Sequence, residues 1–197
     1  MAAQFKLGFY YDFGIGTEFN KSKAFELYNI AAEKGHITAQ YYLGISYQLG
    51  EGIDKDEKKA FEIMKNLVEK DEEKENLDAH FQLGYYYDYG IGTEVNKSKA
   101  IDLYKVAAKK GDIIAQYILG KCYESGEGSI YKDEEKAFEI MRNLAEKEKE
   151  YSDAQFQLGY YYDKGIGTKV NKSKAFELYK IAAVKGHIIS NAFSSSL

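Results

Sequence analysis

The chain has 197 residues, enough for one or two compact domains, and 45% of them are hydrophobic, which is sufficient to bury a core. Its 27 basic and 31 acidic residues give a formal net charge of −4, so no large positive field attracts phosphate, and nucleic-acid binding is not expected. The absence of proline favours uninterrupted helices, and the single cysteine, Cys122, excludes an intrachain disulfide framework and favours a reducing compartment.

The N-terminal residues from Met1 to Lys6 form neither a basic segment nor an apolar stretch of signal-peptide length. No later run approaches the roughly 20 consecutive apolar residues that a membrane-spanning helix needs. We therefore expect a soluble protein of the cytoplasm or the nucleus, without membrane segments.

A five-fold internal repeat dominates the sequence. The pair Leu-Gly recurs at steps of 36, 40, 36 and 39 residues. An Ala lies four residues before each Leu and a Tyr four residues after it, a spacing that places the three on one face of a first helix in each repeat. The members of this Ala-Leu-Tyr row are Ala3, Leu7 and Tyr11; Ala39, Leu43 and Tyr47; Ala79, Leu83 and Tyr87; Ala115, Leu119 and Tyr123; Ala154, Leu158 and Tyr162. We expect this row to be packed, and the Gly beside each Leu to let a neighbouring helix approach closely.

Each first helix is predicted to end at a Gly-x-Gly turn, where glycine supplies the positive φ of a helix C-cap. The turns lie at 14–16, 50–52, 90–92, 126–128 and 165–167. A second helix then begins at a residue whose side chain can cap free N–H groups. These residues are Asn20, Asp56, Asn96, Asp133 and Asn171, and the predicted C-caps Gly35, Gly111 and Gly186 close repeats one, three and five.

The repeats alternate between two types. Repeats one, three and five, which we call odd, share the sequence Asn-Lys-Ser-Lys-Ala and a short second helix. Repeats two and four, which we call even, carry Phe-Glu-Ile-Met at 61–64 and 138–141, and a charged extension at 69–76 and 146–150. The larger period is therefore two repeats, which indicates that a pair was duplicated as a block.

These residues resemble the Sel1-like repeat family, relatives of the tetratricopeptide repeats. The odd repeats one and three meet the family pattern in full, in the latter as Ala79, Leu83-Gly84, Tyr87, Gly90-Ile91-Gly92, Asn96, Lys99-Ala100, Ala107-Ala108 and Gly111. The even repeats depart from it where Leu67-Val68 and Leu144-Ala145 replace Ala-Ala. The resemblance implies an all-α fold, a right-handed α-solenoid of antiparallel helix pairs whose first helices line a concave surface.

We assign the five repeats to residues 3–38, 39–78, 79–114, 115–153 and 154–189. Residues 190–197 are interpreted as the broken start of a sixth repeat and a tail, because 187–193 begin like 36–42 but Ser194-Ser195-Ser196 stand where Leu-Gly should follow. No polar capping helix precedes the first repeat, although the ends of solenoids normally need one. We therefore expect either a fragment of a longer array or a chain that associates with itself end to end.

A second row on each first helix varies where the Ala-Leu-Tyr row does not. It contains the positions three, seven and ten residues after each Ala, and we call it the variable row. The candidate partner-binding residues in it are Tyr10, Phe13, Tyr42, Gln82, Tyr86, Tyr89, Ile118, Gln157 and Tyr161. Exposed aromatic side chains there could anchor an extended peptide or a partner helix. Alternatively, several of these tyrosines fill space between adjacent repeats; an exposed row predicts that Tyr86→Ala with Tyr161→Ala leaves stability nearly unchanged.

Other kinds of site find little support. The Gly-x-Gly turns lack a third glycine at the offset of a phosphate-binding loop, with Phe19 and Lys55 there instead, and no strand precedes them. Two of the three histidines, His36, His80 and His187, occupy the same inter-repeat turn, so neither a metal cluster nor a Cys-His pair is indicated. Three Asn-Lys-Ser triplets match the glycosylation pattern, but helix capping explains their asparagines. No cofactor is expected, and Cys122 is interpreted as an ordinary semi-buried side chain.

The resemblance implies an adaptor or scaffold in signalling or protein quality control. The leading hypothesis is therefore a non-enzymatic module that binds a protein or peptide on the concave face. The alternative is the regulatory or targeting part of a larger, kinase-linked signalling enzyme, because such repeats are often joined to catalytic domains in this family. A contiguous catalytic domain in the full gene would favour the second.

Overall fold

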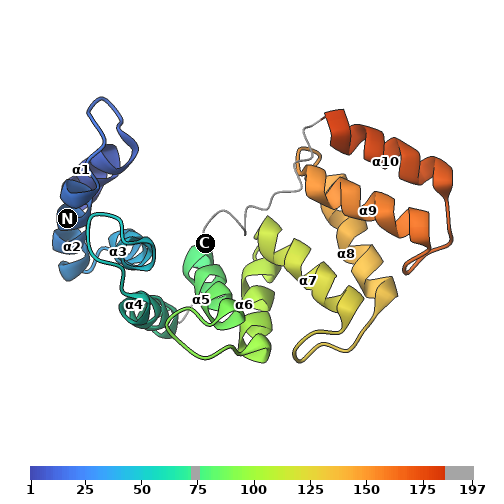
Figure 1. The fold of residues 1–197 in the computed structure, drawn as a ribbon, viewed down its shortest axis with the longest axis horizontal. Helices are drawn as coiled ribbons and strands as arrows, with labels where there is room; N and C mark the ends of the chain where they lie inside the picture. The colour runs from blue at the N-terminus through green and yellow to red at the C-terminus, as the bar shows by residue number, and fades with distance from the viewer. Residues whose placement is uncertain (72–75, 185–197) are drawn as a thin grey trace. The chain divides into compact units, whose positions relative to one another are not determined.

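The structure is a computed structural model that describes residues 1–71 and 76–184 (Figure 1). This part of the chain contains ten α-helices and no strand, which confirms the all-α prediction. The helices are α1 Ala2–Phe13, α2 Lys21–Glu33, α3 Ile37–Leu49, α4 Glu57–Glu69, α5 Leu77–Tyr89, α6 Lys97–Lys109, α7 Ile113–Ser125, α8 Glu134–Lys147, α9 Ser152–Lys164 and α10 Lys172–Val184.

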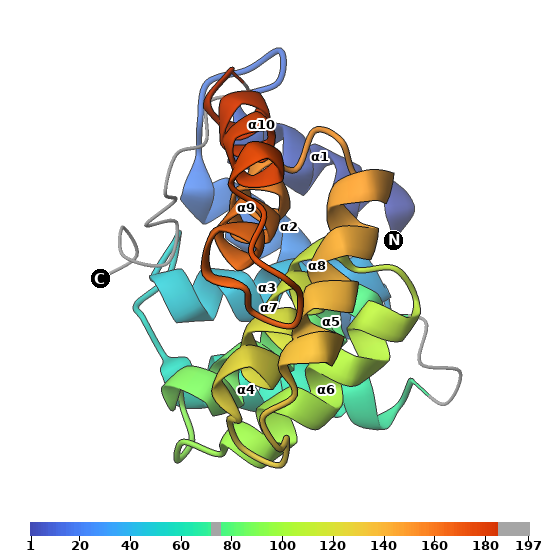
Figure 2. The same cartoon turned by 90° about the vertical axis from the view of Figure 1, so that its right-hand side faces the viewer.

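Each repeat is a helix pair, and the chain divides into two compact units, Met1–Val106 and a second one from Ala107 onward. In the first unit α1 packs on α2 and α3 on α4, while each of these second helices also packs on the first helix of the following repeat. In the second unit α7 packs on α8, α8 on α9, and α9 on α10, the last pair lying side by side in both views (Figures 1 and 2). This stacking of helix pairs is the packing of an α-solenoid.

The predicted helix ends are confirmed. The side-chain oxygen of Asn20 accepts a hydrogen bond from the backbone N–H of Lys23 at 2.9 Å, and the other four predicted N-caps make the same contact three residues on. The first glycine of every Gly-x-Gly turn is a left-handed C-cap, with φ between 64° at Gly14 and 76° at Gly165. Gly35 and Gly111 also have positive φ, and Gly186 lies outside the described residues.

Three caps at the start of first helices escaped the sequence prediction. The side chains of His36, Asn76 and Asp112 accept hydrogen bonds from the backbone N–H three residues later. They stand directly before each predicted first helix, so the Asn and Asp could have been recognised by type. His36 is a less common cap, and its ring also stacks on Phe5 at 4.6 Å.

The Ala-Leu-Tyr row is packed as predicted in repeats two to five, and in repeats two, three and five the preceding second helix covers it. The four alanines are fully buried, and Leu43, Leu83, Leu119 and Leu158 are at most 8% exposed. Phe25 of α2 meets Tyr47 edge-on at 5.4 Å, and Phe61 meets Tyr87 in the same way at 5.3 Å. In repeat one the prediction is wrong: Ala3 is exposed and Leu7 is 49% exposed, since no described helix precedes α1.

The Gly beside each Leu allows close approach, as expected, and the approaching helix is the second helix of the same repeat. A Cβ atom at Gly44 would lie 2.7 Å from the terminal methyl of Met64, and one at Gly84 would lie 2.9 Å from the ring of Tyr104. Any larger residue would therefore push the helix pair apart. The second helix thus fixes a large side chain, Tyr or Met, against the back of each first helix.

Candidate functional site

The variable row does not form one exposed surface. At its middle position, seven residues after each Ala, Tyr86 and Tyr161 are fully buried, and Ser46 and Cys122 are at most 7% exposed. Only Tyr10, at 39%, is exposed there. The expectation of exposed rings at Tyr86 and Tyr161 is therefore wrong; these two tyrosines fill space between adjacent repeats.

Tyr86 and Tyr161 are buried because each reaches the first helix of the preceding, even repeat. The Tyr86 hydroxyl donates a 3.0 Å hydrogen bond to Oε1 of Gln48, which also accepts one from Nε2 of Gln82. The Tyr161 hydroxyl donates in the same way to Oε2 of Glu124 at 3.0 Å. Burial raises the pKa of both phenols, and the Glu124 carboxylate raises that of Tyr161 further. Gln157, a candidate binding residue, is buried and also donates to Oε2 of Glu124, as does Nζ of Lys121.

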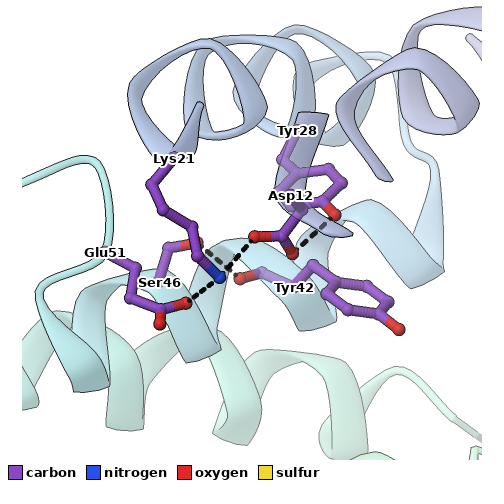
Figure 3. A network of polar contacts seen from close by, with 6 residues as sticks. All are labelled: Asp12, Lys21, Tyr28, Tyr42, Ser46 and Glu51. Atoms are coloured by element: carbon purple, nitrogen blue, oxygen red, sulfur yellow. Dashed lines mark hydrogen bonds and ion pairs between the residues drawn. The ribbon is translucent and has the colours of Figure 1, made fainter. Parts of the chain in front are cut away.

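A different arrangement joins repeats one and two (Figure 3). The residue equivalent to Gln48 is Asp12, and the phenol that bonds it is Tyr28 of α2, at 3.0 Å from Oδ2. Lys21 bridges two carboxylates, with its Nζ 2.7 Å from Asp12 and 2.8 Å from Glu51 of the next repeat. Burial lowers the pKa of Lys21, but its hydrogen bonds to the two carboxylates outweigh that effect and raise it.

The small residue at the middle position of repeat two belongs to this arrangement. Figure 3 shows Ser46 facing the network, where its hydroxyl donates to the backbone carbonyl of Tyr42 at 3.0 Å. The Tyr42 ring stacks on Tyr28 at 5.2 Å and is half-buried. Burial, followed by the negative charge of Asp12, raises the pKa of the Tyr42 phenol.

The two-repeat period of the sequence is therefore a period in packing. In both cases a phenol hydroxyl bonds the side chain nine residues after the Ala of a first helix. For Asp12 in repeat one, the phenol is Tyr28, on the second helix of the same repeat. For Gln48 in repeat two, it is Tyr86, on the first helix of the following repeat. The middle positions read Tyr10, Ser46, Tyr86, Cys122 and Tyr161, and the second-helix positions read Tyr28, Met64, Tyr104, Met141 and Tyr179.

The outer position of the variable row, ten residues after each Ala, is exposed. Phe13, Leu49 and Tyr89 are 48%, 47% and 53% exposed, in three successive repeats of the first unit. Their equivalents in the second unit are polar, Ser125 and Lys164. We call Phe13, Leu49 and Tyr89 the apolar stripe.

Aromatic neighbours support the stripe from one turn earlier. The rings of Phe9 and Phe13 are 4.5 Å apart, and those of Tyr85 and Tyr89 are 4.6 Å apart. These contacts restrict the rotamers of the two exposed rings, so less side-chain entropy remains to be lost when they bind. The inner candidates Tyr42, Gln82 and Ile118 are half-buried.

Signs of a metal site or an enclosed pocket were sought among the described residues. No group of three or more His, Cys, Asp or Glu side chains among them could hold a metal ion. His80 is buried, with Nδ1 2.9 Å from the backbone carbonyl oxygen of Asn76. A groove of about 1070 Å³ between the segments at 53–59 and 90–94 is wide open and lined mainly by charged side chains. Within the same described part of the chain, no helix is long and apolar enough to cross a membrane.

Comparison with known families decides the classification. The Sel1 repeat pattern matches residues 2–36, 37–73, 77–112, 113–148 and 152–187, which together make up most of the chain. The chain belongs to the Sel1 repeat family. The five Sel1 repeats coincide with the five helix pairs of the structure, so the family resemblance of the sequence is confirmed.

Solved structures share the Sel1 fold. A Sel1 repeat protein from Oxalobacter formigenes is 34% identical, with a TM-score of 0.81 over 96% of this chain and 75% of that one. The antigen c5321 of uropathogenic Escherichia coli strains is 25% identical, with a TM-score of 0.82 over 94% of this chain, which spans only 38% of the antigen. The immunity protein Pa5087 from Pseudomonas aeruginosa, 22% identical with a TM-score of 0.56 over 94% of this chain and 66% of that one, shares the fold. A search of curated proteins gives no match.

Proposed function

We propose that this Sel1 repeat protein is a non-enzymatic scaffold that binds a peptide segment of a partner protein on the apolar stripe. The observation that carries the proposal is the exposure of Phe13, Leu49 and Tyr89, each about half accessible at one repeated position. Scattered apolar residues are common on protein surfaces, but a row that recurs with the repeat offers several anchors to one ligand. A cytoplasmic location, which the single cysteine favours, belongs to the same proposal.

The repeat sets the spacing of the anchors. The second helix α2 packs on both α1 and α3, and α4 packs on both α3 and α5, so the anchors recur once per repeat along the first unit. The partner segment is therefore expected to carry apolar residues that recur along its sequence.

The other members of the variable row contribute differently. Tyr86, Tyr161 and Gln157 hold neighbouring repeats together, so they support the surface without touching the ligand. Tyr10 is exposed next to Phe9 and Phe13, and we include it at the edge of the binding surface. Because Ser125 and Lys164 replace the stripe in the second unit, ligand contact is proposed for residues 1–106 alone.

The test selects 12-residue peptides from a displayed random library on the full chain and measures their affinity for two variants. The stripe variant combines Phe13→Ser, Leu49→Ser and Tyr89→Ser. The control combines Val95→Ser, Tyr131→Ser and Val170→Ser, which removes apolar side chains that are 59%, 93% and 58% exposed elsewhere. We expect selected peptides in which apolar residues recur, and an affinity loss of at least about tenfold in the stripe variant alone. Peptides that bind both variants as tightly as the parent chain would refute the proposal.

A further inference from the structure

The first interval of the apolar stripe, between Phe13 and Leu49, carries a network of ion pairs (Figure 3). Nζ of Lys21 lies 2.7 Å from Oδ1 of Asp12 and 2.8 Å from Oε2 of Glu51, which stands two positions after Leu49. The same ammonium lies 6.0 Å from the centroid of the Phe13 ring, so the network borders the stripe. Two carboxylates against one ammonium leave the first interval with one negative charge in excess.

The second interval, between Leu49 and Tyr89, has no such network. Repeats two and three meet there through uncharged side chains, because Gln48 accepts hydrogen bonds from the Tyr86 hydroxyl and from Nε2 of Gln82, both at 3.0 Å. These three groups satisfy one another and carry no formal charge. The contact beneath the second interval therefore gives a charged ligand nothing to pair with.

The ends of the neighbouring helices keep the second interval neutral. Ile91 stands where the preceding turn has Glu51, so the middle residue of the turn adds no carboxylate. Glu57 stands where repeat one has Lys21, and its Oε1 lies 2.8 Å from Nζ of Lys55, which balances its charge. The two intervals therefore differ by one negative charge.

Glu51 is the accessible carboxylate of the first interval. Its side chain is 38% exposed, against 10% for that of Asp12. Lys21 contacts Oε2 of Glu51, and Oε1 takes part in no hydrogen bond within the part of the chain that the structure describes. An ammonium or guanidinium group of a ligand can therefore pair with this carboxylate without displacing Lys21.

We propose that the peptide segment bound by the apolar stripe carries a lysine or arginine between the two apolar residues that meet Phe13 and Leu49. The proposal rests on the proposed function of the stripe, and it adds the charge of the ligand and the place of that charge. A cation there meets the excess negative charge, whereas an acidic residue is repelled. Because the second interval is neutral, the basic residue lies toward one end of the apolar pattern.

The lysines beside the aromatic rings do not favour an acidic ligand. Nζ of Lys97 lies 5.7 Å from the centroid of the Tyr89 ring and pairs with Asp88, the residue directly before that ring. Lys21 pairs in the same way with Asp12. An acidic ligand would have to compete with a carboxylate that is already in place beside each ammonium.

The experiment selects 12-residue peptides from the displayed random library on the full chain and keeps those that the stripe variant binds at least about tenfold more weakly. We expect the peptides that are kept to contain more Lys and Arg than Asp and Glu, relative to the unselected library. A double-mutant cycle then combines replacement of the basic peptide residue by glutamine with Glu51→Gln in the chain, and fluorescence anisotropy measures the four affinities. Each change alone should weaken binding about threefold, and both together no more than about fourfold.

The matched control in the chain is Glu57→Gln, at a carboxylate that is 42% exposed beside the second interval. Its effect should add to that of the peptide change without coupling. The Glu51→Gln chain should keep the contact between repeats one and two, because a glutamine oxygen still accepts a hydrogen bond from Lys21. The peptide change tests the same pair with the chain unaltered.

The outcomes separate this proposal from the proposed function. Stripe-dependent peptides without an excess of basic residues, or effects of Glu51→Gln and the peptide change that simply multiply, would overturn the basic residue and leave the stripe as a binding surface. A library that yields no stripe-dependent peptide would refute the proposed function, and this proposal with it.

Discussion

The contact between repeats one and two and the contact between repeats two and three solve the same packing problem with different residues. In the first, Tyr28 comes from the second helix, Ser46 leaves room for it, and Asp12, Lys21 and Glu51 form an ionic network. In the second, Met64 replaces Tyr28, and Tyr86 brings the phenol from the following helix to a neutral partner, Gln48. The comparison shows a joint choice of side chains: the residue at position seven of a first helix depends on whether the preceding second helix carries Tyr or Met.

The joint choice gives each contact a direction. The second helix of repeat one carries Lys21 and Tyr28, and it suits a following repeat that brings a glutamate and a small residue. An even repeat begins its second helix with Glu57 or Glu134 and is followed by Ile91 or Ile166 in the next turn, so the middle residue of that turn brings no second negative charge to the glutamate. Alternation thereby helps to specify which repeat follows which, as like-charge contacts do at other interfaces.

The largest expected effect is the loss of a phenol from the second type of contact. Tyr86→Ala removes a fully buried ring and leaves Gln48 without its hydroxyl donor, so we expect the free energy of unfolding to fall by about 4 kcal/mol. Urea denaturation of the full chain measures it. The equivalent Tyr10→Ala, at a 39% exposed ring, should cost less than about 1 kcal/mol. Equal losses at the two positions would contradict the assignment of Tyr86 to the contact.

A backbone contact gives the next largest effect. Gly92→Ala places a methyl group against the carbonyl oxygen of Glu57 and also strains a φ of 66°. We expect a loss of about 3 kcal/mol in the free energy of unfolding. Gly16 has a φ of 68° and open space around it, so Gly16→Ala isolates the backbone strain at about 1 kcal/mol. The difference between the thermal midpoints of the two variants measures the inter-repeat contact. Equal midpoints would show that Gly92 tolerates a side chain.

The next effect is that of alkaline pH, which should lower the free energy of unfolding through the buried phenols. Burial raises the pKa of Tyr117 to about 12, and it raises the pKa of Tyr86 as well. A raised folded-state pKa means that the unfolded chain loses the phenolic proton first, from about pH 10, so the free energy of unfolding falls as pH rises above 10.

The variant Tyr86→Phe separates this effect from general alkaline damage. It should cost about 1 kcal/mol at pH 8, because the hydroxyl bond to Gln48 is lost. The gap between this variant and the parent chain should narrow between pH 10 and 11.5, since only the parent must keep that phenol protonated. Urea midpoints at the two pH values measure the gap. A gap that widens with pH would show that ionised Tyr86 is accommodated in the folded chain.

Local sequence rules predicted the helix pairs, the N-caps of the second helices, the described glycine C-caps and the packed row of repeats two to five, because each depends on a short stretch of chain. The exposure of the variable row could not be read in the same way. Whether position seven is covered depends on the size of a side chain some 20 residues earlier, Tyr28 or Met64, on another helix. The sequence nevertheless carried the signal. In repeats two to five, a Tyr in the preceding second helix is followed by Ser or Cys at position seven, and a Met is followed by Tyr.

The most direct test of joint choice converts the first contact into the second type. The row swap Tyr42→Gln with Ser46→Tyr copies Gln82 and Tyr86 into repeat two, and Tyr28→Met copies Met64 into repeat one. Alone, the row swap should cost about 3 kcal/mol by overpacking, and Tyr28→Met about 2 kcal/mol by loss of its ring and hydroxyl contacts. Combined, they should recover at least about 2 kcal/mol relative to the sum in a urea-denaturation double-mutant cycle. Additive losses, within about 0.5 kcal/mol, would contradict the account.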